Sequence, residues 1–143
     1  MGDHDHRYDL ERFVTAQDAG GFERVVGELR QGRKTSHWMW FIFPQVAGLG
    51  SSAMSRRYAI SSLDEARAYL DHPVLGPRLR QCVTILLDLD SLSAHAIFGS
   101  PDDMKLRSSL TLFMQAAPEE LLFRRALERY FDGQPDVATL DRT

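Results

Sequence analysis

The sequence predicts an all-α protein, folded as a single domain of about seven helices. Apolar residues recur along most of the chain at the spacing of an amphipathic helix, most clearly within residues 22–29. Helix-start signals separate these apolar stripes, above all at residues 62–65 and 100–103. No pair of strands of comparable quality is present, and 143 residues are enough to enclose one hydrophobic core.

Two short helices are expected near the N-terminus. Residues 8–17 place apolar side chains on one face, and Asp9 can cap them. The glycine-containing stretch 18–21 breaks this helix. A second helix is expected over residues 21–31, because its apolar stripe ends just before Gly32, a residue type that suits the turn after a helix.

The most aromatic stretch of the chain, residues 34–50, allows two local structures. Ser36 can cap a short helix that Pro44 ends, since the residue before a proline avoids the helical region. Aromatic residues also suit an extended strand, and nearly every position within 37–43 is apolar, so periodicity does not separate the two. We favour a short buried helix because no matching strand partner occurs elsewhere.

The middle of the chain begins with a weakly structured stretch. Residues 46–52 form a Gly/Ser-rich loop, either a simple connection or a cover over a ligand, and residues 55–60 suggest a helical turn. Ser62 and Glu65 then have the spacing of a capping box, which predicts a helix over residues 63–70.

Stronger helices follow. Residues 71–73 stop the preceding helix and start the most apolar one, which runs to about residue 89 and is expected to be central. A short helix is expected at 93–98. Ser100 as N-cap and Pro101 as first helical residue then predict a helix that runs to about residue 116.

The last predicted helix starts at Pro118 and runs to about residue 130, where glycine and proline end it. Residues 134–143 and residues 1–7 are expected to be loose ends. His4 and His6 alternate with aspartates in that N-terminal segment. In a loose terminus such side chains are more often solvated than bound to a metal.

Composition limits the function classes. Apolar content of 43% and charged content of 26% are ordinary for a globular protein, and a net charge of -3 makes nucleic-acid binding unlikely. Cys82 is the only cysteine, so no intramolecular disulfide or cysteine-based zinc site can form. No apolar run could span a bilayer and no signal segment is visible, so we expect a cytoplasmic protein without membrane, metal or cofactor.

His37, at the polar edge of the aromatic stretch, is the candidate catalytic residue. It could act as a general acid or base or donate a hydrogen bond to a ligand, but a histidine that packs on aromatic rings and bonds a backbone carbonyl is the commoner case. The ligand-binding candidates are Lys34, Ser36, Trp38, Trp40, Gln45, Arg56, Lys105, Ser108 and Ser109.

The candidates on the predicted helix 101–116 suggest an anion site. Lys105, Ser108 and Ser109 lie three and four residues apart and so share one helix face. A lysine with two hydroxyls suits a phosphate or a carboxylate, and Arg56 could add a second cation. Serines on a helix can equally permit close helix packing, and the tryptophans can be core residues as well as stacking surfaces.

Long blocks of the sequence resemble a known bacterial family. The blocks are SHWMWFIFPQ (36–45) with GLG (48–50), RRYAI (56–60), SLDEARAYLDHPVLGPRL (62–79) and IFGSPDDMKLRSSLTLF (97–113). They are similar to the family catalogued as domain of unknown function 1810, over about residues 8–140. The resemblance implies a small, mostly helical intracellular domain without an established activity. Some members carry the label calpastatin, which does not suit this chain, because such inhibitors are disordered and this chain has a dense aromatic core.

The helix-rich plan is also faintly similar to the NADAR (YbiA-like) proteins, which act on N-glycosidic bonds of ribosylated compounds. Two hypotheses follow. The first is a pocket beside residues 36–45 that binds a phosphate-bearing, nucleotide-like small molecule, with hydrolysis of an N-glycosidic, ADP-ribose-type bond as its catalytic form. The alternative is a non-catalytic protein–protein interaction module that uses aromatic residues as anchors. The sequence does not decide whether the protein is an enzyme, nor its oligomeric state.

Overall fold

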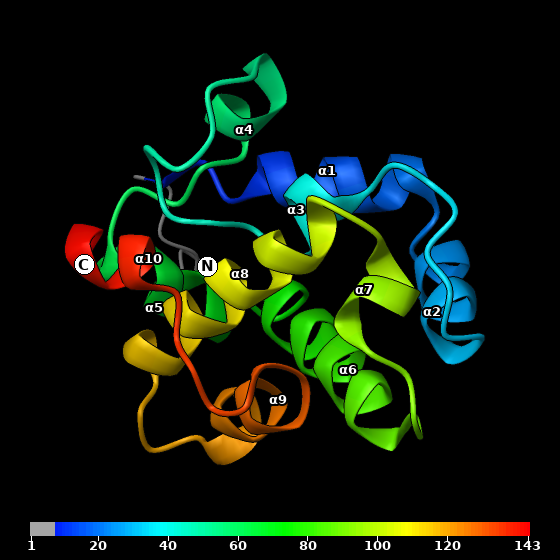
Figure 1. Cartoon of the computed structure of the whole chain (residues 1–143). Helices are drawn as coiled ribbons and strands as arrows, with labels where there is room; N and C mark the ends of the chain where they lie inside the picture. Colours follow the sequence, from blue (N-terminus) through cyan, green and yellow to red (C-terminus); the bar gives the residue numbers. More distant parts are fainter. Residues whose placement is uncertain (1–7) are drawn as a thin grey trace.

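The computed structural model describes residues 8–143, and within them every regular element is a helix (Figure 1). The helices are α1 (Glu11–Gly20), α2 (Phe22–Arg30), α3 (Met39–Ile42), α4 (Ala53–Arg57), α5 (Leu63–Asp71), α6 (Leu75–Asp88), α7 (Ala94–Phe98), α8 (Asp102–Ala116), α9 (Leu121–Phe131) and α10 (Val137–Arg142). The predicted all-α class is confirmed, but the predicted number of about seven helices is too low. The nearest approach to a sheet in this part of the chain is an isolated bridge between Val46 and Ile60.

Two helices organise the core. The α8 helix runs through the middle of the molecule and packs against α5, α7, α9 and α10, while α6 packs against α2, α5 and α9 (Figure 1). Cys82 and Leu86 of α6 and Leu106 and Phe113 of α8 are completely buried. Each such apolar side chain contributes about 1.5–3 kcal/mol by leaving water. The predicted central helix is therefore present, and it shares its role with α8.

The aromatic stretch forms the short buried helix α3, not a strand. Trp38 precedes it without a side-chain cap. The predicted cap by Ser36 is wrong, because its hydroxyl donates instead to Glu28 Oε2 at 2.6 Å. The ring centroids of Phe43 and Phe98 lie 5.9 Å apart in an edge-to-face contact, a favourable arrangement that ties α3 to the end of α7.

Glu28, a buried residue of α2, holds the segment that leads into α3. Its carboxylate accepts hydrogen bonds from the backbone N–H groups of Thr35 and Ser36 at 2.8 and 3.0 Å. The indole Nε1 of Trp38 also donates to Oε1 at 2.9 Å. Burial raises the pKa of Glu28, but these hydrogen bonds outweigh it and lower the pKa to about 2. The carboxylate therefore stays ionised and fixes the loop on α2.

Several helix ends differ from the predicted ones. The α1 helix begins after Leu10 without a cap from Asp9. It continues to Gly20 and is followed by Gly21 as its C-cap, whose φ of 78° suits glycine. The α9 helix begins at Leu121 and not at Pro118. Its preceding residue, Glu120, forms a bidentate pair with Arg80 of α6, with N–O distances of 2.8 and 3.0 Å. That long-range ion pair anchors the chain before α9 starts.

The start of α8 also lies one residue later than predicted, and Ser100 makes no capping bond there. The N–H groups of Asp103 and Met104 donate instead to the backbone carbonyls of Gly99 and Pro101, at 2.9 and 3.0 Å. Backbone bonding thus replaces the expected side-chain cap. The predicted capping by Ser62 is confirmed, since its Oγ accepts from Glu65 N at 3.2 Å.

The C-terminal segment 134–143, expected to be loose, contains α10. Asp136 caps this helix, since its Oδ2 accepts hydrogen bonds from Thr139 N at 3.0 Å and from the Thr139 hydroxyl at 2.6 Å. Thr139 is completely buried, and Asp136 N donates to Thr111 Oγ1 of α8 at 2.9 Å. These bonds hold the segment on α8. The other expected loose end, residues 1–7, lies outside the described residues.

Candidate functional site

A pocket of about 270 Å³ lies where the loop after α3, the first turns of α8 and the start of α10 meet. It is lined by Gln45, Leu49, Gly50, Ser55, Pro101, Met104, Lys105, Ser108, Asp136 and Ala138. Three of the residues selected from the sequence, Gln45, Lys105 and Ser108, are among them. The fold therefore brings the end of the aromatic stretch and the polar face of α8 to one cavity.

Lys105 provides the positive charge of this pocket. Its Nζ lies 5.2 Å from the centroid of the Trp40 ring, within the range of a cation–π contact. The same Nζ lies 3.6 Å from Asp102 Oδ1, while Asp102 Oδ2 lies 2.9 Å from Lys34 Nζ. One carboxylate thus faces two ammonium groups, and its longer distance of 3.6 Å leaves Lys105 the more weakly paired of the two. A ligand anion can therefore approach the ammonium group of Lys105.

Lys34 does not line the pocket, but it pairs with Asp102 beside it. Its side chain is 8% exposed, against 23% for Lys105, and its Nζ lies 5.1 Å from the Trp38 ring centroid. Its backbone N–H donates to the carbonyl of Ile97 at 2.8 Å. Lys34 is therefore held in place on both its backbone and its side chain, and it fixes the position of Asp102 at the start of α8.

The uncharged polar groups of the pocket come from three segments. The side-chain amide of Gln45 forms no hydrogen bond with any described residue, so it can donate to a ligand. The Ser55 hydroxyl lies 2.9 Å from that of Ser52. Ser108 is buried and donates to the Met104 carbonyl at 3.2 Å, which leaves its oxygen able to accept. Both donors and acceptors are thus present.

Asp136 gives the pocket its second charge. One of its oxygens, Oδ2, is engaged in capping α10. Because Oδ1 takes no part in that cap, it can accept hydrogen bonds from a ligand. The lining thus combines an ammonium group with a carboxylate, which suits a molecule that carries both an anionic group and hydroxyl groups.

Glycine shapes the loop wall of the pocket. A Cβ atom on Gly50 would lie 2.5 Å from Ser55 Oγ and 2.7 Å from Ser55 Cβ, so only glycine allows the loop to approach α4 this closely. Gly48 has a φ of 96°, and a Cβ atom there would meet the guanidinium of Arg142. The loop and the end of α10 therefore pack against each other.

The other predicted site residues lie outside the lining of this pocket. His37 is exposed and its side chain forms no hydrogen bond with any described residue, and Arg56 is exposed on α4. Ser36 and Trp38 belong to the Glu28 network. Ser109 is 1% exposed, and its hydroxyl has no hydrogen-bond partner among the described residues. His37, the candidate catalytic residue, therefore does not line this cavity.

Several residues in the pocket lining or beside it were not selected from the sequence. Asp102, which lies beside the lining, was not selected, although its spacing of three from Lys105 is that of an ion pair. Asp136 belongs to the segment expected to be loose. Leu49 and Gly50 lie in the loop for which a ligand cover was one of two interpretations. Nothing local marks them as pocket residues.

Two classes of feature are missing from the described part of the chain. No group of three or more His, Cys, Asp or Glu residues there could hold a metal ion. None of the helices between residues 8 and 143 combines the length and apolar character that crossing a membrane requires.

Comparison with known proteins supplies the family. The chain is similar to the conserved hypothetical protein Rv1873 from Mycobacterium tuberculosis, whose crystal structure aligns with a TM-score of 0.91 and 51% sequence identity, over 94% of this chain and 95% of that chain. No curated protein matches the chain significantly. A family model described as "Protein of unknown function (DUF1810)" matches residues 7–143. Because that match covers nearly the whole chain, this protein belongs to the DUF1810 family, as its sequence blocks predict.

Proposed function

We propose that the pocket at Lys105 binds a small phosphate-bearing, nucleotide-like molecule. The observation that carries this proposal is the position of Lys105, whose Nζ lies in a cavity against the Trp40 ring and shares Asp102 with a second lysine. In this arrangement a phosphate sits beside Lys105, and the Gln45 amide donates to it. Ammonium and amide groups are ordinary partners of phosphate oxygens.

The carboxylate side of the pocket supports the nucleotide-like part of the ligand. An acidic side chain is the usual partner of ribose hydroxyls in nucleotide sites, and Asp136 Oδ1 can play that role. The volume of about 270 Å³ lies just below the usual range for small-molecule sites, about 300–1,000 Å³. The pocket therefore suits a sugar phosphate or the phosphoribosyl part of a nucleotide, with a base extending outside it.

The catalytic form of the proposal is hydrolysis of an N-glycosidic bond in an ADP-ribose-type compound. Such a reaction needs a carboxylate that stabilises positive charge on the sugar or activates water. Asp136 is the carboxylate that lines the cavity, while His37 lies outside the lining. Catalysis therefore adds to binding the requirement that Asp136 reaches the sugar.

The alternative proposal, a protein–protein interaction module, has less support at the place where the sequence suggested it. Trp38, Phe41 and Phe43 are buried, and only Trp40 is partly exposed, so the aromatic stretch does not form an open apolar anchor. Exposed apolar side chains lie instead at Met104, which is 45% exposed, at Leu121 and on α10. Of these, Met104 lines the pocket, so it can equally contact the base of a bound nucleotide.

A cytoplasmic location is part of the same proposal. The single cysteine, Cys82, is a buried free thiol, and burial raises its pKa to about 12, so it remains protonated and unreactive. A chain without disulfides is typical of reducing compartments, where phosphorylated metabolites are also abundant.

A thermal-shift screen tests the proposal. Wild-type protein is melted with inorganic phosphate, ribose 5-phosphate, AMP, ADP-ribose and NAD. A ligand at 100 times its dissociation constant stabilises the fold by about 2.7 kcal/mol, which raises the melting temperature by several degrees. We expect a shift with ribose 5-phosphate or AMP that Lys105→Ala removes and Arg124→Ala, an exposed control on α9, retains.

Two results would speak against this proposal. The first is no shift with any of the compounds, which would favour a search for a protein partner. The second is a shift that Lys105→Ala leaves intact, which would place binding elsewhere. Release of free base from NAD or ADP-ribose, lost in Asp136→Asn, would extend the proposal from binding to hydrolysis.

A further inference from the structure

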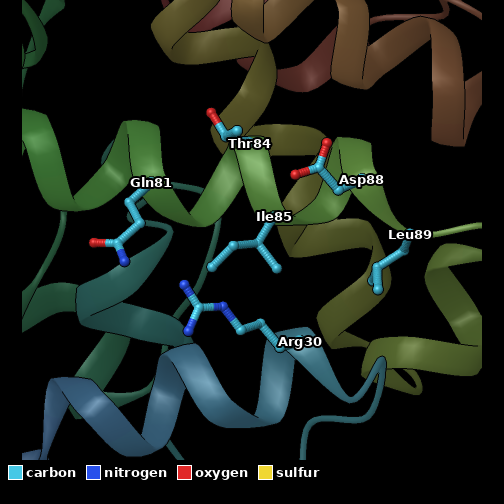
Figure 2. A pocket seen from close by; sticks show the side chains of 6 residues that line it. All are labelled: Arg30, Gln81, Thr84, Ile85, Asp88 and Leu89. Carbon is cyan, nitrogen blue, oxygen red and sulfur yellow. The ribbon is translucent and has the colours of Figure 1, made fainter.

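The two ends of the central helix α6 have different surroundings. From Gln81 onward, α6 faces α2 across a groove of about 450 Å³, and most of the side chains in it, such as those of Arg30 and Asp88, are exposed (Figure 2). At its beginning, α6 is joined to α5 by a short turn that contains His72. The His72 side chain is buried, since the residue is only 5% exposed. The joint between α5 and α6 is therefore built around one buried histidine.

The His72 ring binds the first N–H groups of α6. Its Nδ1 accepts hydrogen bonds from the backbone N–H groups of Val74 and Leu75, at 3.1 and 3.2 Å. A ring nitrogen that accepts hydrogen bonds carries no proton, so the ring is neutral and its proton is on Nε2. Leu75 is completely buried, so water cannot replace the ring as the partner of its N–H group.

Protonation of His72 would disrupt this arrangement. An imidazolium carries a proton on both nitrogens, so Nδ1 would change from an acceptor to a donor and would face two other donors. The N-terminus of a helix also carries a partial positive charge, which disfavours a cation there. Both effects favour the neutral ring in the folded protein.

Charged side chains on the helices that meet at His72 act on the same equilibrium. Most of those on α1, α5 and the first turns of α6 are already in ion pairs, namely Arg12–Glu65, Arg67–Asp64, Arg78–Asp18 and Arg80–Glu120. The others on these helices are Glu11, Asp71 and Asp88, and all three are exposed. Glu11 reaches the ring, since its Oε2 lies 3.5 Å from His72 Nε2.

The attraction to Glu11 favours the protonated ring, but it is the weaker effect. The Glu11 side chain is 63% exposed, so water screens its charge. The two backbone hydrogen bonds lie inside the protein and would be lost together. We propose that His72 is a pH-sensitive lock, which fixes α6 to α5 while its ring is neutral and loosens this joint in a mildly acidic environment. The lock is independent of the ligand proposed for the Lys105 pocket.

The direction of the pH effect follows from the neutral ring. A histidine in the unfolded chain takes up a proton near about pH 6.5, whereas in the folded protein the same proton would break the two hydrogen bonds. The lock therefore contributes its full stability above about pH 7. That contribution is lost as the pH falls below about 6.5, by up to about tenfold in the unfolding equilibrium constant for each pH unit.

Urea denaturation at pH 7.5 and pH 5.5 tests this inference. In His72→Asn, the asparagine Oδ1 replaces Nδ1 as the acceptor and does not take up a proton in this range. Between the two pH values, we expect the unfolding equilibrium constant of the wild type to rise about fivefold to tenfold more than that of His72→Asn. His37→Asn, the matched control at an exposed histidine, should follow the wild type. An equal rise in the wild type and in His72→Asn overturns the inference.

The ring of the wild-type protein gives a second test that needs no variant. Two-bond ¹H–¹⁵N NMR spectra show which nitrogens of each histidine carry a proton. At pH 6 we expect His72 to be neutral, with its proton on Nε2, while the exposed His37 is mainly protonated. A proton on Nδ1 of His72 at pH 7.5, or protonation of His72 together with His37, overturns the inference even where His72→Asn fails to fold.

Discussion

Replacing Glu28 with glutamine should destabilise the protein in a pH-dependent way. Glu28 accepts four hydrogen bonds, from Thr35 N, from Ser36 N and Oγ, and from Trp38 Nε1. Its pKa, lowered from 4.5 to about 2, corresponds to roughly 3 kcal/mol of stability at neutral pH. Glutamine keeps one acceptor oxygen but loses the charge, so we expect a loss of about 2–3 kcal/mol at pH 7.

The direction of the pH effect follows from the lowered pKa. A carboxylate with a folded pKa below its unfolded value stabilises the fold above pH 4.5, and this contribution is lost as the pH falls toward 2. The difference in unfolding free energy between the wild type and Glu28→Gln should therefore narrow by about 2 kcal/mol between pH 7 and pH 3.

Urea denaturation at several pH values measures this difference. Glu23→Gln on the exposed side of α2 is the matched control and should follow the wild type throughout. A difference for Glu28→Gln that stays constant between pH 7 and pH 3 would refute the argument that the ionised carboxylate holds the loop.

Two further substitutions test the packing and the charge cluster. Gly76→Ala should destabilise the fold by about 2–3 kcal/mol, since its Cβ would collide with the backbone carbonyl of Leu70. Gly27→Ala, with no atom near its Cβ, should be neutral or stabilising by up to about 1 kcal/mol. Urea denaturation measures both free energies of unfolding, and equal values for the two variants would contradict this prediction. Asp102→Asn leaves Lys34 without its ion-pair partner and should lower the unfolding free energy by about 2 kcal/mol, measured by thermal denaturation. Equal stability with the wild type would show that the ion pair does not stabilise the fold.

The fold class followed from the sequence because periodicity and caps are local signals. Ser62 caps α5 as its spacing predicts, and the apolar stripe of 73–89 became the central helix α6. The errors came where distant groups compete with local ones. Ser36 donates a hydrogen bond to Glu28 and does not cap a helix, and Glu120 pairs with Arg80 just before α9. The helices therefore start at other residues than the local pattern predicts.

Three of the residues selected from the sequence line the pocket, because their selection rested on local signals. Lys105 and Ser108 share a helix face at a recognisable spacing, and Gln45 ends a conspicuous aromatic stretch. Their meeting in one pocket depends on tertiary packing. Asp136 could not be found, because the helix it caps is short and depends on the burial of Thr139 against α8.

An amide NMR titration with ribose 5-phosphate tests the central claim most directly, because it reports both binding and place. The account predicts saturable shifts at the side-chain amide of Gln45 and the backbone of Gly50 and Lys105. They should disappear in Lys105→Ala and persist in Arg124→Ala. Saturable shifts confined to another surface, or none up to about 10 mM ligand, would contradict a phosphate-binding pocket at Lys105.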